Sequence, residues 1–489
     1  MSAAASIVKK LNLPNWVLAV LTLVALFRLP TLLEPFWYGD ELIYLTVGNG
    51  IRQGLLLYRD IFDHKTPLLY YLAAIAGNVF WFRAILLFWM LGTVAIFYKL
   101  ASSLYPKNKH VQMVAVTFFA ILTTIPFIEG TIANAEIFMI GPTIAAFYIL
   151  LGKRLTNTKA MFAGLLLSVT TLLKVPAAVD IGAIVFLWTV LVVRKKLVLT
   201  NFIRSSLLLF VGWGSSLLAV TIIFFGLGAL QPYLESVLLI NFGFYVPAFQ
   251  EAAASGPSPL LIRAGLTASG LAFLFFLRNR LSKQFLFATA WLILALFAVT
   301  IPARPYPHYF IQAVPPLALV IGVLVAGKTL EQSLAIVPLL VAFLVPVHFN
   351  FWHYPTISYY QQFLSFAAGN ISREEYFQRF GDATNDHYDI ANFVRSTTLP
   401  EERIFVWGDA PPIYALSRRL PPSRFVATFH IIDFQSRDET LSDIVRGEPK
   451  LIILTANAPE FHELDAYLRD NYLLIKTTQS SQIWSRVGA

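Results

Sequence analysis

Residues 34–69 read EPFWYGDELIYLTVGNGIRQGLLLYRDIFDHKTPLL, and they lie between two strongly apolar regions of the chain. Two acids, Asp40 and Glu41, stand side by side soon after the first apolar region ends. Further along, Asp60, His64 and Lys65 fall within six positions. Only 13% of all residues are charged, so this concentration of ionisable groups marks the stretch as the centre of the chain's chemistry.

The composition around this stretch is that of a membrane protein. The chain has 489 residues, of which 57% are hydrophobic, and its mean hydropathy is +0.65. Apolar runs of about twenty residues recur, and each is long enough to cross a bilayer as a helix. Cysteine is absent, which excludes disulfides, thiolate metal sites and a cysteine nucleophile. The net charge of +9 comes largely from cations at helix ends, a pattern typical of membrane topology and not of nucleic-acid binding.

The charge pattern also orients the first part of the chain. The Lys9–Lys10 pair precedes the apolar run 14–33, which we interpret as an uncleaved signal anchor with a cytoplasmic N-terminus. Residues 34–66 then form an external loop. Within and after it, residues 40–51 are expected as an amphipathic surface helix and 67–82 as a second interfacial helix, because a full span there would place the next cations outside.

The same bias gives a consistent alternation for the rest of the apolar part, with about eleven spans and an external C-terminus. The chain is therefore expected to be a mainly α polytopic membrane protein with a small C-terminal extracytoplasmic α/β domain. The expected spans are residues 14–33, 83–105, 111–127, 138–151, 161–179, 181–193, 202–225, 260–277, 285–301, 309–326 and 334–349.

The sequence changes character near residue 352, which predicts a membrane domain over 1–351 and a second domain over 352–489. In the second domain short apolar runs alternate with helical patterns, which indicates a largely parallel sheet. The expected strands are 403–407, 425–429, 451–455 and 472–476, and the expected helices are 388–396, 439–446 and 459–470. The tripeptide WGD at 407–409 is too short to identify a phosphate loop.

Several cations lie where the topology does not favour them. Lys174 falls in the outer half of an otherwise uncharged span, where an ammonium costs a few kcal/mol unless it is paired or faces water. Arg28 has the same status, and Lys65 and Arg304 are external cations against the inside-positive bias. Each alone is explained by snorkelling to the interface, but together they indicate a site for an anion at the outer membrane surface.

Other polar residues at external helix ends have two possible roles each, one functional and one structural. Asn134 and Glu136 either close the same cavity or cap a helix. His308 lies beside Tyr309 and either binds substrate or is an ordinary hydrogen-bonding histidine. Asp60 and Asp63 either orient the neighbouring His64 or Lys65 or are simply solvated.

This layout suits transfer from a lipid phosphate. An external carboxylate can take the proton of an acceptor hydroxyl, and cations can stabilise a departing phosphate. Nucleotide-activated donors are cytoplasmic, whereas an outward anion site at membrane depth suits a polyprenyl phosphate, with apolar spans beside it for the isoprenoid tail.

The order of these motifs resembles a known family. The acid pair after the first span is followed by DIFDHKTP at 60–67, an Asn134-x-Glu136 segment and RPYPHY at 304–309. This order resembles the GT-C membrane glycosyltransferases, in the branch of the protein O-mannosyltransferases and the lipid A aminoarabinose transferase. The resemblance covers about residues 10–350 and carries little into the C-terminal domain.

The resemblance implies an inverting transferase that uses a polyprenyl-phosphate-linked sugar at the outer face, with Asp40 as the base and Glu41 positioning it. Lys65 would contact the lipid phosphate. The acceptor would be a hydroxyl of a lipid, a polysaccharide or a protein. No cofactor is expected, although Asp40 and Glu136 could share a divalent ion. The remaining residues expected to bind substrate are His64, Asp60, Asn134, Glu136, Lys174, Arg304, His308 and Tyr309.

Two other classes of function stay open from the sequence. A transporter or flippase for a lipid-linked anionic glycan would also explain intramembrane cations, although no internal repeat is visible. A non-catalytic scaffold would leave Asp40, Lys65 and Lys174 unexplained. Contact with the acceptor is assigned to residues 226–259 and to the C-terminal domain.

Overall fold

The computed structural model describes residues 13–152, 154–243, 259–326 and 330–488. The chain separates into two compact units, which we describe one at a time. The membrane unit comprises Met1–Leu29, Ile85–Ile223 and Leu238–Thr356, and the sheet unit comprises Pro30–Ala84, Phe224–Val237 and Ile357–Ala489. The assigned acceptor loop 226–259 lies partly outside the described residues.

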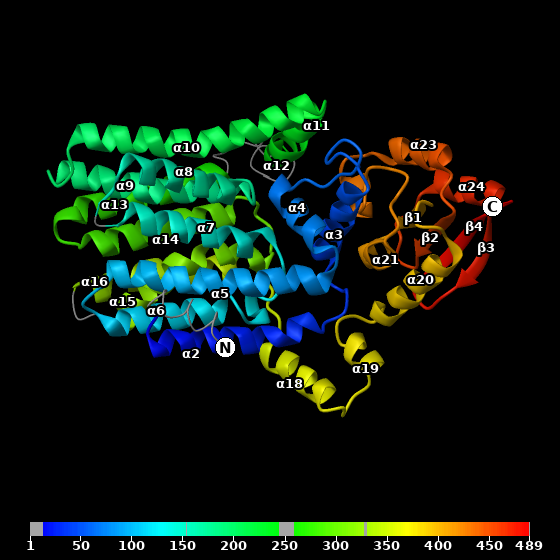
Figure 1. The fold of residues 1–489 in the computed structure, drawn as a ribbon, viewed down its shortest axis with the longest axis horizontal. Helices are drawn as coiled ribbons and strands as arrows, with labels where there is room; N and C mark the ends of the chain where they lie inside the picture. Colours follow the sequence, from blue (N-terminus) through cyan, green and yellow to red (C-terminus); the bar gives the residue numbers. More distant parts are fainter. Residues whose placement is uncertain (1–12, 153, 244–258, 327–329, 489) are drawn as a thin grey trace, which may run out of the picture. The chain divides into compact units, whose positions relative to one another are not determined.

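The membrane unit is built of long apolar helices, several of which run nearly parallel to one another (Figure 1). Within the described residues, eight helices are long and apolar enough to cross a membrane, and three further apolar helices are shorter. Each of the expected spans coincides with a helix, which confirms a multi-pass membrane protein. These helices are α2 (Asn15–Arg28), α5 (Val79–Leu104), α6 (Lys109–Leu122), α7 (Ala135–Leu150), α8 (Asn157–Thr171), α9 (Ile181–Val193), α10 (Leu199–Gly226), α13 (Pro259–Phe276), α14 (Lys283–Thr300), α15 (Val314–Ala326) and α17 (Ile336–His348).

Local chemistry explains where these helices begin and how closely they pack. The side chains of Asn108 and Ser282 accept backbone N–H groups and cap the first turns of α6 and α14. Gly164 of α8 and Gly212 of α10 let the two helices approach so closely that a Cβ on either would collide with the facing backbone. Small residues at such crossings are typical of helix packing in membranes.

Several spans are interrupted near their ends, which corrects two expected boundaries. The expected span 161–179 is helical only to Thr171, and a 3-10 helix η3 (Val175–Asp180) follows. Pro176 in its first turn has no N–H to donate and so cannot continue α8. In the same way η8 (Pro307–Ala313) precedes α15. Short elements also lie beside the long helices; they are η1 (Leu29–Leu32), η2 (Pro126–Ile128), η7 (Leu277–Asn279), α12 (Ile240–Gly243) and α16 (Leu330–Leu334).

The expected interfacial helix 67–82 is also shorter than predicted. Helix α4 (Pro67–Ala76) ends at Gly77, whose φ of 70° is a left-handed conformation that favours glycine. Helix α5 then starts at Val79, where the Asn78 side chain accepts the Trp81 N–H at 3.0 Å. The predicted helix is present, but it ends at Gly77 and not at residue 82.

The sheet unit combines the charged loop with the α/β domain. Its helix α3 (Gly39–Arg52) confirms the helix expected over 40–51, but most of its residues are buried and it packs on α4 and α21, so it is not the surface helix that was predicted. The other elements are α11 (Leu230–Leu234) with a π-helix (Glu235–Leu239), α18 (Thr356–Ala367), α19 (Arg373–Gln378), α20 (Thr384–Thr397), β1 (Ile404–Trp407), α21 (Pro411–Ser417), α22 (Thr428–Asp433), α23 (Arg437–Gly447), β2 (Leu451–Thr455), α24 (His462–Asn471), β3 (Tyr472–Thr477) and β4 (Ser481–Arg486).

The sheet has four strands in the order β1-β2-β4-β3, and it is not the largely parallel sheet that the sequence predicted. Only β1 and β2 pair in parallel, with Ile404 opposite Leu451. Strand β4, which the prediction missed, pairs antiparallel with both β2 and β3. Strands β3 and β4 therefore form an antiparallel hairpin, where the prediction had a parallel strand reached by a crossover connection.

The predicted strand 425–429 is wrong. Phe425 forms an isolated bridge with Phe62, and the Phe62 N–H donates to the Arg424 carbonyl at 2.8 Å. The chain then turns into α22 at Thr428, whose hydroxyl accepts the Gly408 N–H at 2.9 Å. The apolar run therefore serves a contact with the first loop and does not join the sheet.

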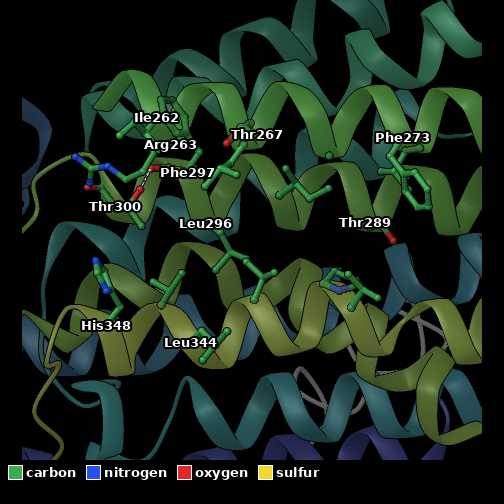
Figure 2. Close-up of a pocket in the computed structure, with 18 of the residues that line it drawn as sticks. Ile262, Arg263, Thr267, Phe273, Thr289, Leu296, Phe297, Thr300, Leu344 and His348 are labelled. Carbon is green, nitrogen blue, oxygen red and sulfur yellow. Dashed lines mark hydrogen bonds between the residues drawn. The ribbon is translucent and has the colours of Figure 1, made fainter. Parts of the chain in front are cut away.

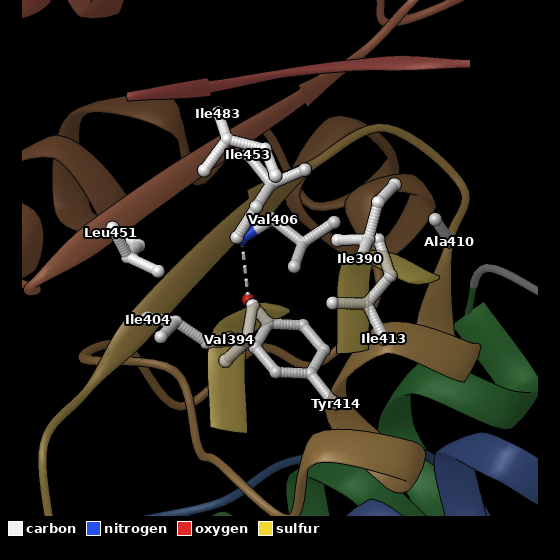
Figure 3. Close-up of a cluster of buried hydrophobic side chains, with 10 residues drawn as sticks. All are labelled: Ile390, Val394, Ile404, Val406, Ala410, Ile413, Tyr414, Leu451, Ile453 and Ile483. Atoms are coloured by element: carbon white, nitrogen blue, oxygen red, sulfur yellow. Dashed lines mark hydrogen bonds between the residues drawn. The ribbon is translucent and has the colours of Figure 1, made fainter. Parts of the chain in front are cut away.

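Alternating strand residues face the two sides of the sheet. Ile404 and Val406 pack with Leu451, Ile453 and Ile483 beneath α20 and α21 (Figure 3). Tyr414 of α21 reaches into this core, and its hydroxyl accepts the Val406 N–H at 2.8 Å (Figure 3). On the other face the Trp407 ring lies 4.9 Å from that of Phe461, just before α24. Strand β1 and most of β2 are thus buried, whereas most residues of β3 are exposed.

Candidate functional site

The centre of the sheet unit's polar cluster is an ion pair between Asp40 and Lys65. Asp40 lies in the first turn of α3, and the Lys65 ammonium donates to its Oδ2 at 2.6 Å. Tyr44, one turn further along α3, donates its hydroxyl to the same oxygen at 3.0 Å and also contacts the Lys65 ammonium. The side chains of Asp40 and Lys65 are 34% and 20% exposed, so a substrate can reach both charges.

The backbone of Lys65 is held on both sides by buried tyrosines. The Lys65 N–H donates to the Tyr70 hydroxyl at 3.0 Å, and the Tyr58 hydroxyl donates to the Lys65 carbonyl at 2.7 Å. Both rings are fully buried. Two buried tyrosine hydroxyls therefore hold the backbone of the residue that carries the ammonium.

A second carboxylate, Asp409, lies in the electrostatic reach of Asp40. It follows β1 in the WGD tripeptide, next to Gly408, whose φ of 120° favours glycine. Crowding protein atoms and the charge of Asp40 both raise the pKa of Asp409, although its side chain reaches the surface. Asp409 was not among the expected site residues, although the carboxyl end of a parallel strand is a usual position for such residues.

Glu41, the other member of the acid pair, turns away from solvent into a buried ion cluster. Arg83 donates to both Glu41 oxygens, with its Nη2 at 2.6 Å from Oε2, and to Glu34 Oε2 at 2.7 Å. All three side chains are 1% exposed. Tyr359 also donates to Glu34. Glu41 thus anchors the start of α3, beside Asp40.

Asp60 closes the turn before Lys65. Its carboxylate accepts the Leu56 N–H at 2.9 Å and pairs with the exposed Arg59. The hydrogen bond from Arg59 lowers the pKa of Asp60. The structure therefore gives Asp60 a local role in shaping the loop.

His64 meets Asp63 and His430 in a tight group. His64 Nδ1 lies 3.0 Å from Asp63 Oδ1 and 3.2 Å from His430 Nε2. Burial is the main cause that lowers the pKa of His430, to about 3. Burial opposes ionisation of Asp63, but the neighbouring His64 and His430 hold its pKa below the usual range. His430 comes from α22, far along the chain, and no motif in the sequence predicts its place beside His64.

The membrane unit holds its own polar cluster at the interrupted helix ends. Lys174 pairs with Glu136, and its ammonium lies 3.8 Å from the centre of the Tyr309 ring. His308 pairs through Nδ1 with Glu129, and its Nε2 is 3.7 Å from Glu136. Lys174 and His308 therefore have carboxylate partners inside the unit, and Glu129 was not among the expected residues.

The remaining expected residues of this unit are placed as follows. Asn134 is buried at the N-cap of α7, two residues before Glu136. Arg304 is half-buried in the segment between α14 and η8. Arg28 is buried and donates to the carbonyls of Thr123 and Gly130 at 2.7 and 2.6 Å, so it supports a loop and the anion-binding interpretation does not hold for it.

A groove of about 730 Å³ runs between α13, α14 and α17 of the membrane unit. Its walls are mainly apolar side chains such as Leu266, Phe273 and Leu344. Figure 2 shows Arg263, which donates to the Thr300 carbonyl, and His348 together at one end. The groove is therefore mainly apolar, with two polar side chains at one end.

The site residues thus form two clusters, one in each unit. The structure confirms that Asp40 contacts Lys65 and places His64 and Asp60 near them in the same loop. It places Glu136, Lys174, His308 and Tyr309 together in the membrane unit. Asp40 and Glu136 belong to different units, so an ion shared by them stays a prediction.

Comparison with known proteins gives a family match for the C-terminal domain and a fold match for the whole chain. Residues 384–484 match the family of the C-terminal domain of the competence-induced protein Ccs4. A search of curated proteins gave no match.

The crystal structure of ArnT from Cupriavidus metallidurans bound to undecaprenyl phosphate is similar, with a TM-score of 0.58 at 13% identity over 97% of this chain and 98% of that chain. The apo form of ArnT gives a TM-score of 0.53 at the same identity and coverage. The apo oligosaccharyltransferase of Archaeoglobus fulgidus is less similar, with a TM-score of 0.45 at 14% identity over 90% of this chain and 69% of that chain. At this low identity the likeness concerns the fold alone, and the chain therefore has the fold of the ArnT structures.

Proposed function

We propose that this protein is an inverting glycosyltransferase that moves a hexose or pentose from a polyprenyl-phosphate-linked donor to a hydroxyl acceptor at the outer face of the membrane. One observation carries the proposal: a partly exposed carboxylate, Asp40, is held by the ammonium of Lys65 in a protein of the ArnT fold. Such a pair supplies both charges that the reaction needs within a few ångströms.

In the proposed reaction Asp40 accepts the proton of the acceptor hydroxyl as its oxygen forms a bond to the anomeric carbon. The bond from that carbon to the phosphate oxygen breaks, and its electron pair leaves with the polyprenyl phosphate. Lys65 turns from Asp40 to the phosphate as negative charge develops there. A single displacement of this kind inverts the configuration at the anomeric carbon.

The other residues support this centre in distinct ways. Glu41 orients α3 through Arg83, and Asp60 and His64 shape the loop that carries Lys65. We assign Lys174, Arg304, His308 and Tyr309 to further contacts with the donor head group, with Asn134 and Glu136 holding them in place. The reaction is proposed to need no metal at Asp40, and the C-terminal domain is proposed to lie outside the cytoplasm and to contact the acceptor.

The two alternative functions predict different behaviour of Asp40. A flippase moves the lipid-linked sugar intact, so it would release no polyprenyl phosphate. A scaffold has no use for a partly exposed ion pair whose lysine is fixed by two buried tyrosines. The Asp40–Lys65 geometry therefore favours the transferase.

Replacing Lys65 by glutamine should lower kcat/KM for the donor by about 10- to 100-fold, because a hydrogen bond to a charged group contributes roughly 1.5–3 kcal/mol. Steady-state transfer kinetics on the purified variant would measure this. Lys99→Gln is the matched control, since Lys99 also lies over a tyrosine ring, at 5.9 Å from that of Tyr98, and should be unaffected. Equal losses in both variants would contradict a phosphate contact by Lys65.

We also propose that the groove between α13, α14 and α17 holds the isoprenoid tail of the donor. In Gly270→Leu, the new side chain would meet Ile293, whose Cδ1 lies 3.3 Å from a Cβ built there. KM should rise about tenfold for a long-chain donor and little for a short one, because roughly 1.4 kcal/mol of apolar contact is lost. Gly265→Leu on the same helix has open space and serves as the control. An identical rise for both chain lengths would show that the groove does not hold the tail.

A further inference from the structure

We infer that Asp63, His64 and His430 form a site for a single zinc ion. The claim concerns the side chains that flank Lys65 and is independent of the reaction at Asp40. Within the described residues, this is the group whose donor atoms come close enough together to share one metal ion.

The three donor atoms form a nearly equilateral triangle. His64 Nδ1 to Asp63 Oδ1 is 3.0 Å, His64 Nδ1 to His430 Nε2 is 3.2 Å, and His430 Nε2 to Asp63 Oδ1 is 3.4 Å. Zinc binds imidazole nitrogen and carboxylate oxygen at about 2.0–2.1 Å in a tetrahedron, which places any two ligand atoms about 3.3 Å apart. The triangle therefore has the size that zinc requires, and the fourth position is left for a water.

Hydrogen bonds among the three side chains explain the arrangement less well. Asp63 Oδ1 already accepts the His64 backbone N–H at 2.7 Å, so two imidazole donors would crowd onto one oxygen. A cation at the centre of the triangle satisfies all three inward-facing atoms at once and compensates the buried carboxylate.

The three candidate ligands lie in a largely buried, aromatic environment. Asp63 is 2% exposed and His430 is fully buried. The rings of Phe62 and Phe434 lie 5.3 and 5.8 Å from the His430 ring and limit access of water. The Phe62 N–H to Arg424 carbonyl bond joins the two segments that supply the ligands. An apolar shell of this kind stabilises the orientation of the ligands.

A zinc ion here would tie the loop before α4 to α22. Its ligand His64 directly precedes Lys65, so the ion would act as a positioning element for that ammonium. This consequence rests on the proposed function, whereas the binding of zinc does not.

The test is metal binding to the full-length protein, purified in detergent and stripped with a chelator. Titration with Zn²⁺ should give one ion per chain, and Co²⁺ in its place should show the intense visible absorption of a tetrahedral complex. His64→Gln and His430→Gln should each weaken Zn²⁺ binding by roughly 100-fold or more. Zinc should raise the Tm of the wild type and should leave that of the two variants unchanged.

His462→Gln is the matched control, because His462 is an exposed histidine 3.7 Å from a glutamate, and it should bind zinc as the wild type does. Asp40→Asn should also bind zinc normally, so loss of transfer and loss of metal binding are read separately. If His430→Gln does not fold, the Co²⁺ spectrum of the wild type decides. Absence of a tetrahedral spectrum, or equal zinc binding in the His64 and His462 variants, would overturn the site.

Discussion

Replacing Asp40 by asparagine should reduce the rate of glycosyl transfer by about 10²–10⁴-fold, the range that general-base catalysis contributes. The amide keeps the size of the side chain and can still accept a hydrogen bond from Lys65, but it cannot take up the proton of the acceptor. The loss should therefore appear in kcat, while the affinity for the donor should be retained or rise, because Lys65 is no longer shared with a carboxylate. Single-turnover transfer and equilibrium donor binding on the same preparation measure the two effects.

Asp60→Asn is the control for this substitution. Asp60 lies in the same loop and is also half-buried, but it pairs with the exposed Arg59. Its variant should keep most of the activity. The assignment of Asp40 as the base would fail if the two asparagine variants were equally active, or if Asp40→Asn lost activity only through unfolding.

Replacing Arg83 by methionine should lower the free energy of unfolding by about 3–5 kcal/mol, because it leaves two buried carboxylates without their cation. Glu34 and Glu41 are each 1% exposed. Unfolding of the full chain in detergent micelles, followed by circular dichroism, measures the loss. Arg59→Met removes an exposed pair and should cost under about 1 kcal/mol.

The pH dependence of this loss has a defined sign. Burial is the largest influence on Glu34 and raises its pKa, even with Arg83 present. Without Arg83 the pKa of the folded state rises further, so protonation favours the folded state as the pH falls. The deficit of Arg83→Met should therefore be smaller at pH 5 than at pH 8, and adding Glu34→Gln and Glu41→Gln should largely remove it. A deficit that is the same at both pH values would exclude buried, unpaired carboxylates as its cause.

The membrane architecture could be predicted because its signals are local. Runs of apolar residues about twenty long specify helices whatever surrounds them, and the expected spans all coincide with helices. The errors lie where proline and glycine change the backbone within such runs. Pro176 ends α8 early, and Gly77 separates α4 from α5.

The sheet was predicted less well because strand pairing is not local. β1, β2 and β3 were correct in place, but alternation of strand and helix suggested parallel pairing for all of them. Strands β3 and β4 pair antiparallel, and the sequence of such short strands does not predict with which strand they pair. Residues 425–429 have a strand-like composition, yet they pack on Phe62.

In the candidate site, the sequence identified the charged residues but not all of their partners. Asp40 and Lys65 were both predicted to belong to one site, and their side chains are in contact. The pairing of Glu41 with Arg83 was not predicted, because the two residues are 42 positions apart and no sequence pattern links them. His430 and Asp409 were missed because the fold alone brings them to the first loop, from more than 300 residues away.

The central claim is that the protein cleaves the bond between a sugar and a polyprenyl phosphate. The direct test is incubation of the purified wild type and Asp40→Asn with a panel of polyprenyl-phosphate sugars, with the lipid product identified by mass spectrometry. We expect the wild type to convert at least one donor to free polyprenyl phosphate and the variant to leave it intact. Donors that all stay intact with the wild type, or equal release by both proteins, would contradict the claim.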